Sequence, residues 1–305
     1  MQKLLAFLQL CRFAAVFTAM ADIVLGYLLT HSGFDSARDF GLLLGASSCL
    51  YVAGMVLNDI FDREVDARER PKRPIPSGRV SLRAAVLLGA VLIIAGLVLS
   101  FGVGRNSLLL AVLLTACIFL YDGVLKSTLV GPVAMGACRF LNVMLGASAA
   151  LPFGAGVPSF AGIWALPQLA VGAGLGLYIV GVTWFARQEA RTSRRPQLIA
   201  AQLMVNLGLA WLMAFVLMSP DELRRSANVA LIVGFVGLIL NGRLLNAVID
   251  PSPAKVQASI KTMLLSLVML DASLIFFVQE NRLYAFAVAL LVIPATLLGR
   301  FLAIT

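Results

Sequence analysis

The sequence predicts an all-α fold: a polytopic bundle of nine or ten transmembrane helices with a central cavity, formed as one domain over residues 1–305. Hydrophobic residues make up 60% of the chain and charged residues only 13%, far from the composition of a soluble globular protein. Apolar runs of about 20 residues recur from end to end, and a run of that length crosses a bilayer core of roughly 30 Å. No low-complexity linker separates the runs, so we expect a single integral membrane domain.

The apolar runs define the expected spans in order along the chain. The first run carries Arg12 and Asp22, so we expect a mature helix there instead of a cleaved signal peptide. The longest connection, residues 61–82, contains three prolines, which end the preceding helix because proline lacks an amide donor. The last run follows a short polar break and could cross the membrane, re-enter it or lie against the bundle. The expected spans cover residues 12–30, 40–60, 83–103, 107–121, 128–150, 164–186, 197–218, 227–248, 256–278 and 284–303.

Basic residues are concentrated in alternate connections. The net charge is +9, and seven arginines and lysines lie from Arg63 to Arg83, with four arginines from Arg187 to Arg195. Because positively charged loops stay on the cytoplasmic side, we expect these loops and the N-terminus in the cytoplasm, in a bacterial inner membrane. Contact with anionic membrane lipid explains most of this charge. Nucleic acid is not expected as a partner, because the chain has no separate soluble basic domain.

Cysteine and histidine give no support for other kinds of site. The four cysteines are scattered in apolar runs, without the spacing of metal ligands or of a disulfide framework. His31 is the only histidine and follows the first run in a loop. A histidine-based zinc site and a Ser-His-Asp triad are therefore not supported.

A group of carboxylates closes the second apolar run. Residues 58–66 read Asn-Asp-Ile-Phe-Asp-Arg-Glu-Val-Asp, and the aspartates at 59, 62 and 66 are spaced i, i+3 and i+7. A helix places these three side chains on one face, with Asn58 beside Asp62. Three like charges repel unless a cation neutralises them, and Mg²⁺ prefers carboxylate oxygens and bridges to phosphates. The spacing therefore predicts a Mg²⁺ site for a diphosphate at a membrane face, with Asn58, Asp59, Asp62 and Asp66 as candidate ligands.

This motif, with the downstream segment 73–78 (Arg-Pro-Ile-Pro-Ser-Gly), resembles the UbiA superfamily of intramembrane prenyltransferases. The resemblance extends along the chain to the segments 121–126 and 139–146. Within the superfamily, the stretch 183–190 (Thr-Trp-Phe-Ala-Arg-Gln-Glu-Ala) looks like the EboC-like subgroup. The resemblance thus covers most of the chain.

The resemblance implies both a reaction and the residues that serve it. Members bind an isoprenyl diphosphate through Mg²⁺ and two acidic motifs, ionise its C–O bond and alkylate a hydrophobic or aromatic acceptor, while the isoprenoid tail enters from membrane lipid. Preplaced positive charge would stabilise the departing diphosphate. The implied metal ligands are Asn58, Asp59, Asp62, Asp66 and Glu189. The implied catalytic residues are Asp62, Asp66, Lys126 and Tyr121, with Lys126 on the diphosphate and Tyr121 lining the cation pocket. Further diphosphate contacts are expected from Arg12, Arg70, Arg73, Arg139 and Asn142.

The second acidic motif departs from the family pattern. Residues 186 and 190 are both alanine where acids would be expected, so only Glu189 keeps a carboxylate. One alternative is therefore a non-catalytic UbiA-like protein that binds or carries a lipid or a metabolite. Glu189 could equally form a surface ion pair with Arg187 or Arg191.

Charged residues inside the apolar runs raise a further alternative. Asp22, Arg139 and Asp271 lie within expected spans, where ionisable groups are costly and often functional. They suggest a transporter, although the main carboxylate group lies at a membrane face and not at the midplane. Arg139 and Asn142 fit a structural polar network as well as they fit a cavity wall.

Overall fold

A computed structural model of the chain describes residues 2–150, 166–219 and 223–299, and these residues form helices without strands. A short 3₁₀ turn precedes α2, a second follows α7, and a π-turn, Tyr121–Leu125, joins α6 to the segment before α7. The helices are α1 (Gln2–Leu10), α2 (Val16–Leu28), α3 (Ala37–Phe61), α4 (Arg63–Glu69), α5 (Leu82–Val103), α6 (Arg105–Leu120), α7 (Gly131–Ala147), α8 (Pro167–Ala186), α9 (Arg195–Met218), α10 (Leu223–Ile249), α11 (Pro253–Val278), α12 (Arg282–Leu290) and α13 (Val292–Leu298).

Most of the expected spans are confirmed as long apolar helices. Within the described ranges, 8 helices are long and apolar enough to cross a membrane, and a ninth span results if the bent pair formed by α1 and α2 is counted as one. The chain is thus an integral, multi-pass membrane protein. The last expected run forms only the shorter apolar stretch Arg282–Leu298, divided between α12 and α13. Residues 164–165 and 300–303 of the expected spans lie outside the described residues, and the central cavity stays a prediction.

The first span differs from the single helix expected from residue 12. The chain already forms α1 before this point and then bends by 46°. Arg12 lies at the bend, with φ 43° and ψ 46°. These angles fall in the left-handed region of the backbone, which residues other than glycine seldom adopt. Such a backbone persists where surrounding contacts favour it, and the Arg12 guanidinium reaches the end of α3.

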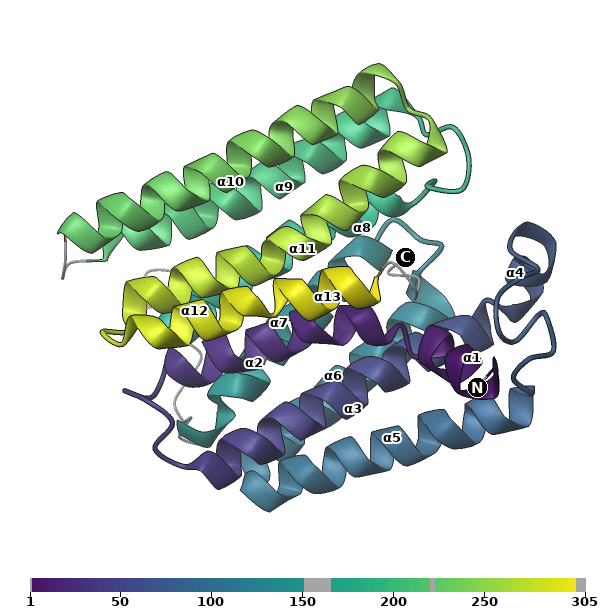
Figure 1. The fold of residues 1–305 in the computed structure, drawn as a ribbon, viewed down its shortest axis with the longest axis horizontal. Helices are drawn as coiled ribbons and strands as arrows, with labels where there is room; N and C mark the ends of the chain where they lie inside the picture. The colour runs from purple at the N-terminus through teal and green to yellow at the C-terminus, as the bar shows by residue number, and fades with distance from the viewer. Residues whose placement is uncertain (1, 151–165, 220–222, 300–305) are drawn as a thin grey trace.

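The bundle has outer helices along two opposite edges and further helices between them. Figure 1 shows α9 and α10 along one edge, α5 along the opposite edge, and α2, α7 and α11 in the middle. Contacts run from α5 through α3 and α2 to α7 and α11, and from α7 through α8 to α9. The outer helices expose large apolar side chains, as expected where helices face lipid; examples are Leu87, Ile94, Phe101, Leu231 and Leu238.

Glycines bring α2 and α7 close together in the centre of the bundle. A Cβ atom on Gly26 would lie 2.2 Å from the Val143 carbonyl oxygen, and one on Gly146 would lie 2.6 Å from the Ile23 carbonyl oxygen. Small residues allow this kind of close backbone approach between membrane helices. Both glycines thus allow the close packing of α2 on α7.

The polar connections gather at one end of the bundle. Figure 1 shows α1 and α4 at the same end, on the right of the view. The connection after α4 turns through Gly78, whose φ of 73° suits glycine, and Ser81 then caps α5 by accepting from the Ala84 amide at 3.3 Å. This end of the molecule carries the acidic motif.

Candidate active site

The acidic motif straddles the junction between α3 and α4. The Asp62 amide donates to the Asn58 carbonyl oxygen at 2.9 Å, and the Asp66 amide donates to the Asp62 carbonyl oxygen at 2.8 Å. No such bond joins residues 63–65 to residues 59–61, so the single helix expected across the motif is divided at Asp62, which caps the end of α3 and the start of α4. Asp59 and Asp66 are almost fully buried, at 3% and 4% exposed. Their carboxylates therefore need compensating charges close by.

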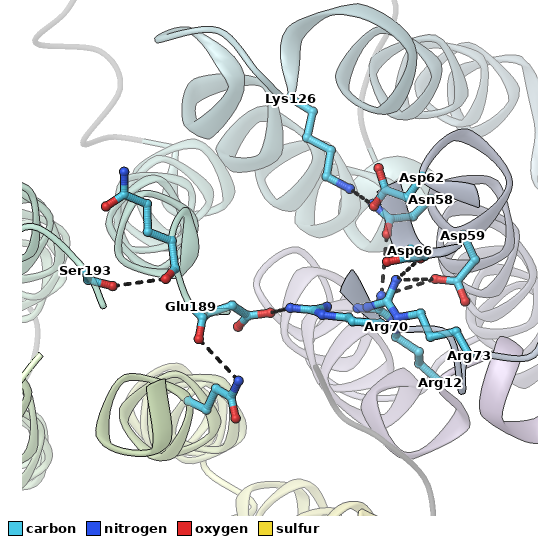
Figure 2. A network of polar contacts seen from close by, with 12 residues as sticks. Arg12, Asn58, Asp59, Asp62, Asp66, Arg70, Arg73, Lys126, Glu189 and Ser193 are labelled. Carbon is cyan, nitrogen blue, oxygen red and sulfur yellow. Dashed lines mark hydrogen bonds and ion pairs between the residues drawn. The ribbon is translucent and has the colours of Figure 1, made fainter. Parts of the chain in front are cut away.

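Two arginines supply that compensation. Arg73, from the connection after α4, lies between two aspartates: its Nη1 is 2.6 Å from Asp66 Oδ2 and 3.2 Å from Asp59 Oδ1. The Arg12 Nη2 lies 3.3 Å from Asp59 Oδ1 and donates to Asn58 Oδ1 at 3.5 Å. The bend before α2 and the loop after α4 thus converge on the end of α3, as Figure 2 shows.

The π-turn adds a lysine and a second carboxylate to the group. Lys126 forms an ion pair with Asp62, and its backbone amide donates to the Tyr121 carbonyl oxygen at 2.9 Å, which closes the π-turn. Asp122 accepts a hydrogen bond from Asn58 Nδ2 at 2.8 Å. Turns of this kind are often found at functional sites. The Tyr121 side chain is buried at the start of the same turn.

Asp122 is a site residue that the sequence interpretation missed. It lies next to Tyr121 and four positions before Lys126, inside a segment already singled out for its family resemblance. The available signal was a carboxylate next to two candidate site residues near the end of an apolar run. Its contact with Asn58, 64 positions away in the chain, has no counterpart in local spacing.

The connections that follow α4 and α8 meet at this site. Arg70 Nη2 lies 2.9 Å from Glu189 Oε1, in the connection between α8 and α9. A second ion pair joins Arg191 Nη2 to Glu69 Oε1 at 2.6 Å. Figure 2 shows Arg70 between Glu189 and the aspartate group. Glu189 thus pairs with Arg70 and not with Arg187 or Arg191, the two partners considered from the sequence.

Arg139 and Asn142 lie in a different place. Arg139 contacts Asp22 and Thr18, and Asn142 contacts Asp22 and Ser47, all in the interior of the bundle. No contact recorded among the described residues joins them to the acidic motif. The structure therefore does not bring these two residues to the diphosphate candidates, and it favours the polar-network interpretation.

The donor set at the end of α3 fits Mg²⁺ in chemistry. Among the described residues, no three acidic, histidine or cysteine side chains are grouped closely enough to hold a metal by themselves. Mg²⁺ usually binds through one or two carboxylates together with substrate phosphates, so a closed protein cage is not required. The available oxygen donors are Asn58, Asp59, Asp62, Asp66, Asp122 and Glu189, and the basic side chains between them are Arg12, Arg70, Arg73 and Lys126.

Comparison with known families agrees with this geometry. Residues 16–240 match the model of the UbiA prenyltransferase family. The chain belongs to the UbiA prenyltransferase family. Several relatives are named digeranylgeranylglyceryl phosphate synthase. That of Methanocaldococcus jannaschii is 41% identical over 103 residues, covering 33% of this chain and 35% of the relative. That of Saccharolobus solfataricus is 33% identical over 110 residues, covering 35% and 38%. The chain thus matches little more than a third of these relatives' length.

Solved structures of UbiA homologues share the fold over almost the whole chain. The homologue from Archaeoglobus fulgidus, bound to GPP and Mg²⁺, matches with a TM-score of 0.64 and 17% identity over 93% of this chain and 99% of that one. The apo homologue from Aeropyrum pernix K1 matches with a TM-score of 0.64 and 21% identity, over 85% and 96%. At these identities the similarity establishes the fold of the bundle and does not by itself assign a substrate.

Proposed function

We propose that this chain is a Mg²⁺-dependent prenyltransferase that moves an isoprenyl group from an isoprenyl diphosphate to a hydrophobic or aromatic acceptor within the membrane. The observation that carries the proposal is the convergence at one end of the bundle. Asp62 with Lys126, and Glu189 with Arg70, bring the two family motifs to a common group of charges. A diphosphate with Mg²⁺ combines negative and positive charge in the way such a group can bind.

The residues of the group divide into two roles. Asn58, Asp59, Asp62 and Asp66 would hold Mg²⁺, which supplies positive charge that neutralises the diphosphate as the C–O bond breaks. Lys126, Arg70, Arg73 and Arg12 would donate to phosphate oxygens, where charge-assisted bonds stabilise the developing negative charge. In the structure each of these cations is paired with a carboxylate. On substrate binding the cations would pair with phosphate oxygens and the carboxylates with Mg²⁺, so no charge would be left unpaired.

The apolar side of the site suits the allylic cation. Tyr121 is buried beside Asp122 and would line the pocket for the cation. The surrounding helices would exclude water, which would otherwise capture the cation before the acceptor does. The tail of the donor would enter from lipid. The names of the relatives are compatible with a lipid-type acceptor, while the EboC-like resemblance of residues 183–190 leaves the acceptor open.

The orientation that we propose rests on charge. The basic residues around α4 and in the connection after α8 lie at the same end as the acidic motif. By the positive-inside rule this end, with the N-terminus, would face the cytoplasm. The bacterial inner membrane is the location that we propose. The relatives named above are archaeal.

A non-catalytic binding protein is the second candidate. It is favoured by one observation, the alanines at 186 and 190, which leave Glu189 as the only acid of the second motif, already paired with Arg70. Such a protein would keep Mg²⁺-dependent binding of isoprenyl diphosphate but would release no inorganic diphosphate.

One experiment separates the candidates. Purified protein in lipid is mixed with Mg²⁺, a panel of isoprenyl diphosphates and candidate acceptors, and binding, diphosphate release and prenylated product are measured. The proposal predicts release and product that disappear with chelator and in Asp62→Ala. Asp250→Asn is the matched control, since it removes an exposed carboxylate paired with Lys255 at the connection before α11. Binding without release in the wild type supports the second candidate, and absence of Mg²⁺-dependent binding refutes both.

A further inference from the structure

The centre of the bundle holds a charged cluster that the proposed reaction does not use. Asp22 from α2 and Asp271 from α11 are 0% exposed, and Arg139 from α7 is 8% exposed. Arg139 Nη2 lies 2.6 Å from Asp22 Oδ1 and 3.8 Å from Asp271 Oδ2. The cluster lies deep in the membrane, because Ser47, which bonds to it through Asn142, is about 18 Å along α3 from Asp59.

The hydrogen bonds of the cluster are unequally distributed. Asp22 Oδ2 accepts from Asn142 Nδ2 at 2.9 Å, and Arg139 Nη2 donates to the Thr18 carbonyl oxygen at 3.1 Å. Neither carboxyl oxygen of Asp271 has a hydrogen-bond partner among the described residues, and the same holds for Arg139 Nε and for Asp22 Oδ1, which forms the ion pair with Arg139. A fully buried polar group without a partner is rare and requires an explanation. Water, an ion or a proton would each supply one.

Charge distinguishes these explanations. Two carboxylates and one guanidinium leave one negative charge uncompensated in the interior of a membrane protein, which is costly. The Asp22 and Asp271 carboxyls also lie close together, since both are within 3.8 Å of the same Arg139 nitrogen. Two carboxylates cannot bond to one another because both only accept, and like charges this close do not both ionise.

We propose that Asp22 and Asp271 form an intramembrane proton-binding site and hold one proton between them. The proton makes one carboxyl a donor to the other, so Asp271 gains the bond that it otherwise lacks. It also leaves a single negative charge opposite Arg139, and the cluster becomes neutral. The neutral cluster then links α2, α7 and α11, which belong to distant parts of the chain. Of the other described ionisable groups nearby, Tyr178 on α8 is bonded to the Met263 carbonyl oxygen and to Ser266, and Tyr51 on α3 lies close to Asp22 and Arg139.

The site is tested by infrared spectroscopy of the purified wild type and of Asp271→Asn in lipid. An amide has nearly the shape of a protonated carboxyl but no acidic proton, so Asp271→Asn is expected to fold with a Tm close to that of the wild type. The difference spectrum should contain the C=O stretching band of a buried carboxylic acid, sensitive to deuterium. The band should be absent from Asp22→Asn as well as from Asp271→Asn. In Asp22→Asn the remaining carboxyl, Asp271, would be ionised and would carry the negative charge opposite Arg139.

The double variant provides the second measurement. Asp22→Asn with Asp271→Asn leaves Arg139 without a counter-charge, so its Tm should fall far more than the two single changes together. A difference spectrum without a carboxylic acid band would overturn the proposal. So would an Asp271→Asn variant as unstable as the double variant, or a wild-type Tm that rises specifically with Na⁺, since a metal ion would then replace the proton.

A separate observation concerns Asn58 and Asp122. The Asn58 amide nitrogen donates to Asp122 Oδ1 at 2.8 Å, and its oxygen accepts from Arg12 Nη2 at 3.5 Å. A carboxylate only accepts and a guanidinium only donates, so these two neighbours allow one orientation of the amide. Within the proposed function, we infer that Asp122 is a positioning residue that keeps the Asn58 oxygen on the side of Asp59, available to the metal. Hydrogen bonds behind metal ligands fix their orientation in this way.

A double-mutant cycle tests whether Asp122 acts through Asn58. The readout is the Mg²⁺ concentration that half-saturates binding of an isoprenyl diphosphate. Asp122→Ala should raise this concentration by about 10- to 100-fold in the wild type and leave it unchanged in Asn58→Ala. Asp122→Asn, which still offers an oxygen to Asn58, should retain most of the affinity.

Equal effects in both backgrounds would show that Asp122 acts independently of Asn58 and would overturn the inference, as would no effect in the wild type. Failure of the proposed function is recognised separately, because the wild type would then bind no isoprenyl diphosphate in response to Mg²⁺.

Discussion

Arg70 and Glu189 form an ion pair of 2.9 Å across 119 positions of the chain. The pair joins the connection after α4 to the connection after α8, and the Arg191–Glu69 pair lies beside it. It therefore brings the remaining acid of the second motif to the end of α3. It also means that a ligand for Glu189 must compete with a guanidinium.

The first prediction compares Glu189 with the aspartates. Asp66→Ala should abolish Mg²⁺-dependent binding of isoprenyl diphosphate, because it removes a buried carboxylate and the shorter of the two ion pairs of Arg73, which then keeps only Asp59. Glu189→Ala should weaken binding only a few-fold, since Arg70 is then free to contact the phosphates. The measurement is a calorimetric titration of each variant, with the melting temperature as a check on folding. Equal losses in the two variants would show that the second motif still contributes a full metal site.

The second prediction restores acids to the second motif. Ala190 is exposed and Ala186 is half-buried at the end of α8, so both positions can accept a larger side chain. Ala186→Asp with Ala190→Asp should lower the Mg²⁺ concentration required for diphosphate release. Thr192→Asp, which adds an acid at another exposed position in the same connection, should have no such effect. If both variants respond alike, net charge and not metal ligation is the cause.

The third prediction concerns the packing of α2 on α7. Gly26→Ala should destabilise the protein by about 1–3 kcal/mol, because the new Cβ would lie 2.2 Å from a carbonyl oxygen that belongs to the backbone and cannot move aside. Gly242→Ala is the control: its Cβ meets nothing within 4 Å, and alanine favours helix over glycine by about 1 kcal/mol. Thermal unfolding in lipid measures both. A Gly26→Ala variant as stable as the control would contradict the close approach.

The fourth prediction concerns the ion pair of Lys126 with Asp62. Lys126→Met should lower the rate of diphosphate release at least tenfold at saturating Mg²⁺, because a donor to the departing phosphate is lost. Lys126→Arg should recover part of the rate. Steady-state rates over a range of donor concentrations would reveal the difference. An unchanged maximal rate with weaker binding would restrict Lys126 to substrate binding.

Patterns local in the sequence predicted the parts of the structure that depend on local physics. The apolar runs became membrane helices because their length and composition allow little else. The cap at Ser81 follows from the same kind of local rule. These features needed no knowledge of the rest of the chain. The aspartates do lie at the end of the second run, but the single helix expected to carry them is divided at Asp62.

Contacts between distant segments were beyond such patterns. Nothing near Arg12 indicates a left-handed bend, because the bend depends on the reach of its side chain to the end of α3. Asp122 became part of the site only through its bond to Asn58, and Glu189 found Arg70 and not its neighbours. Each of these outcomes is set by which helices pack together, and spacing along the chain does not encode that.

A structure of the protein in lipid, with Mn²⁺ in place of Mg²⁺ and a non-reactive isoprenyl thiolodiphosphate, tests the central claim most directly. The account predicts anomalous metal density beside Asp62 and Asp66, with diphosphate density reaching Lys126 and Arg70 and the tail entering the bundle. Density for the ligand at another end of the molecule, or beside the acids without any metal, would contradict it.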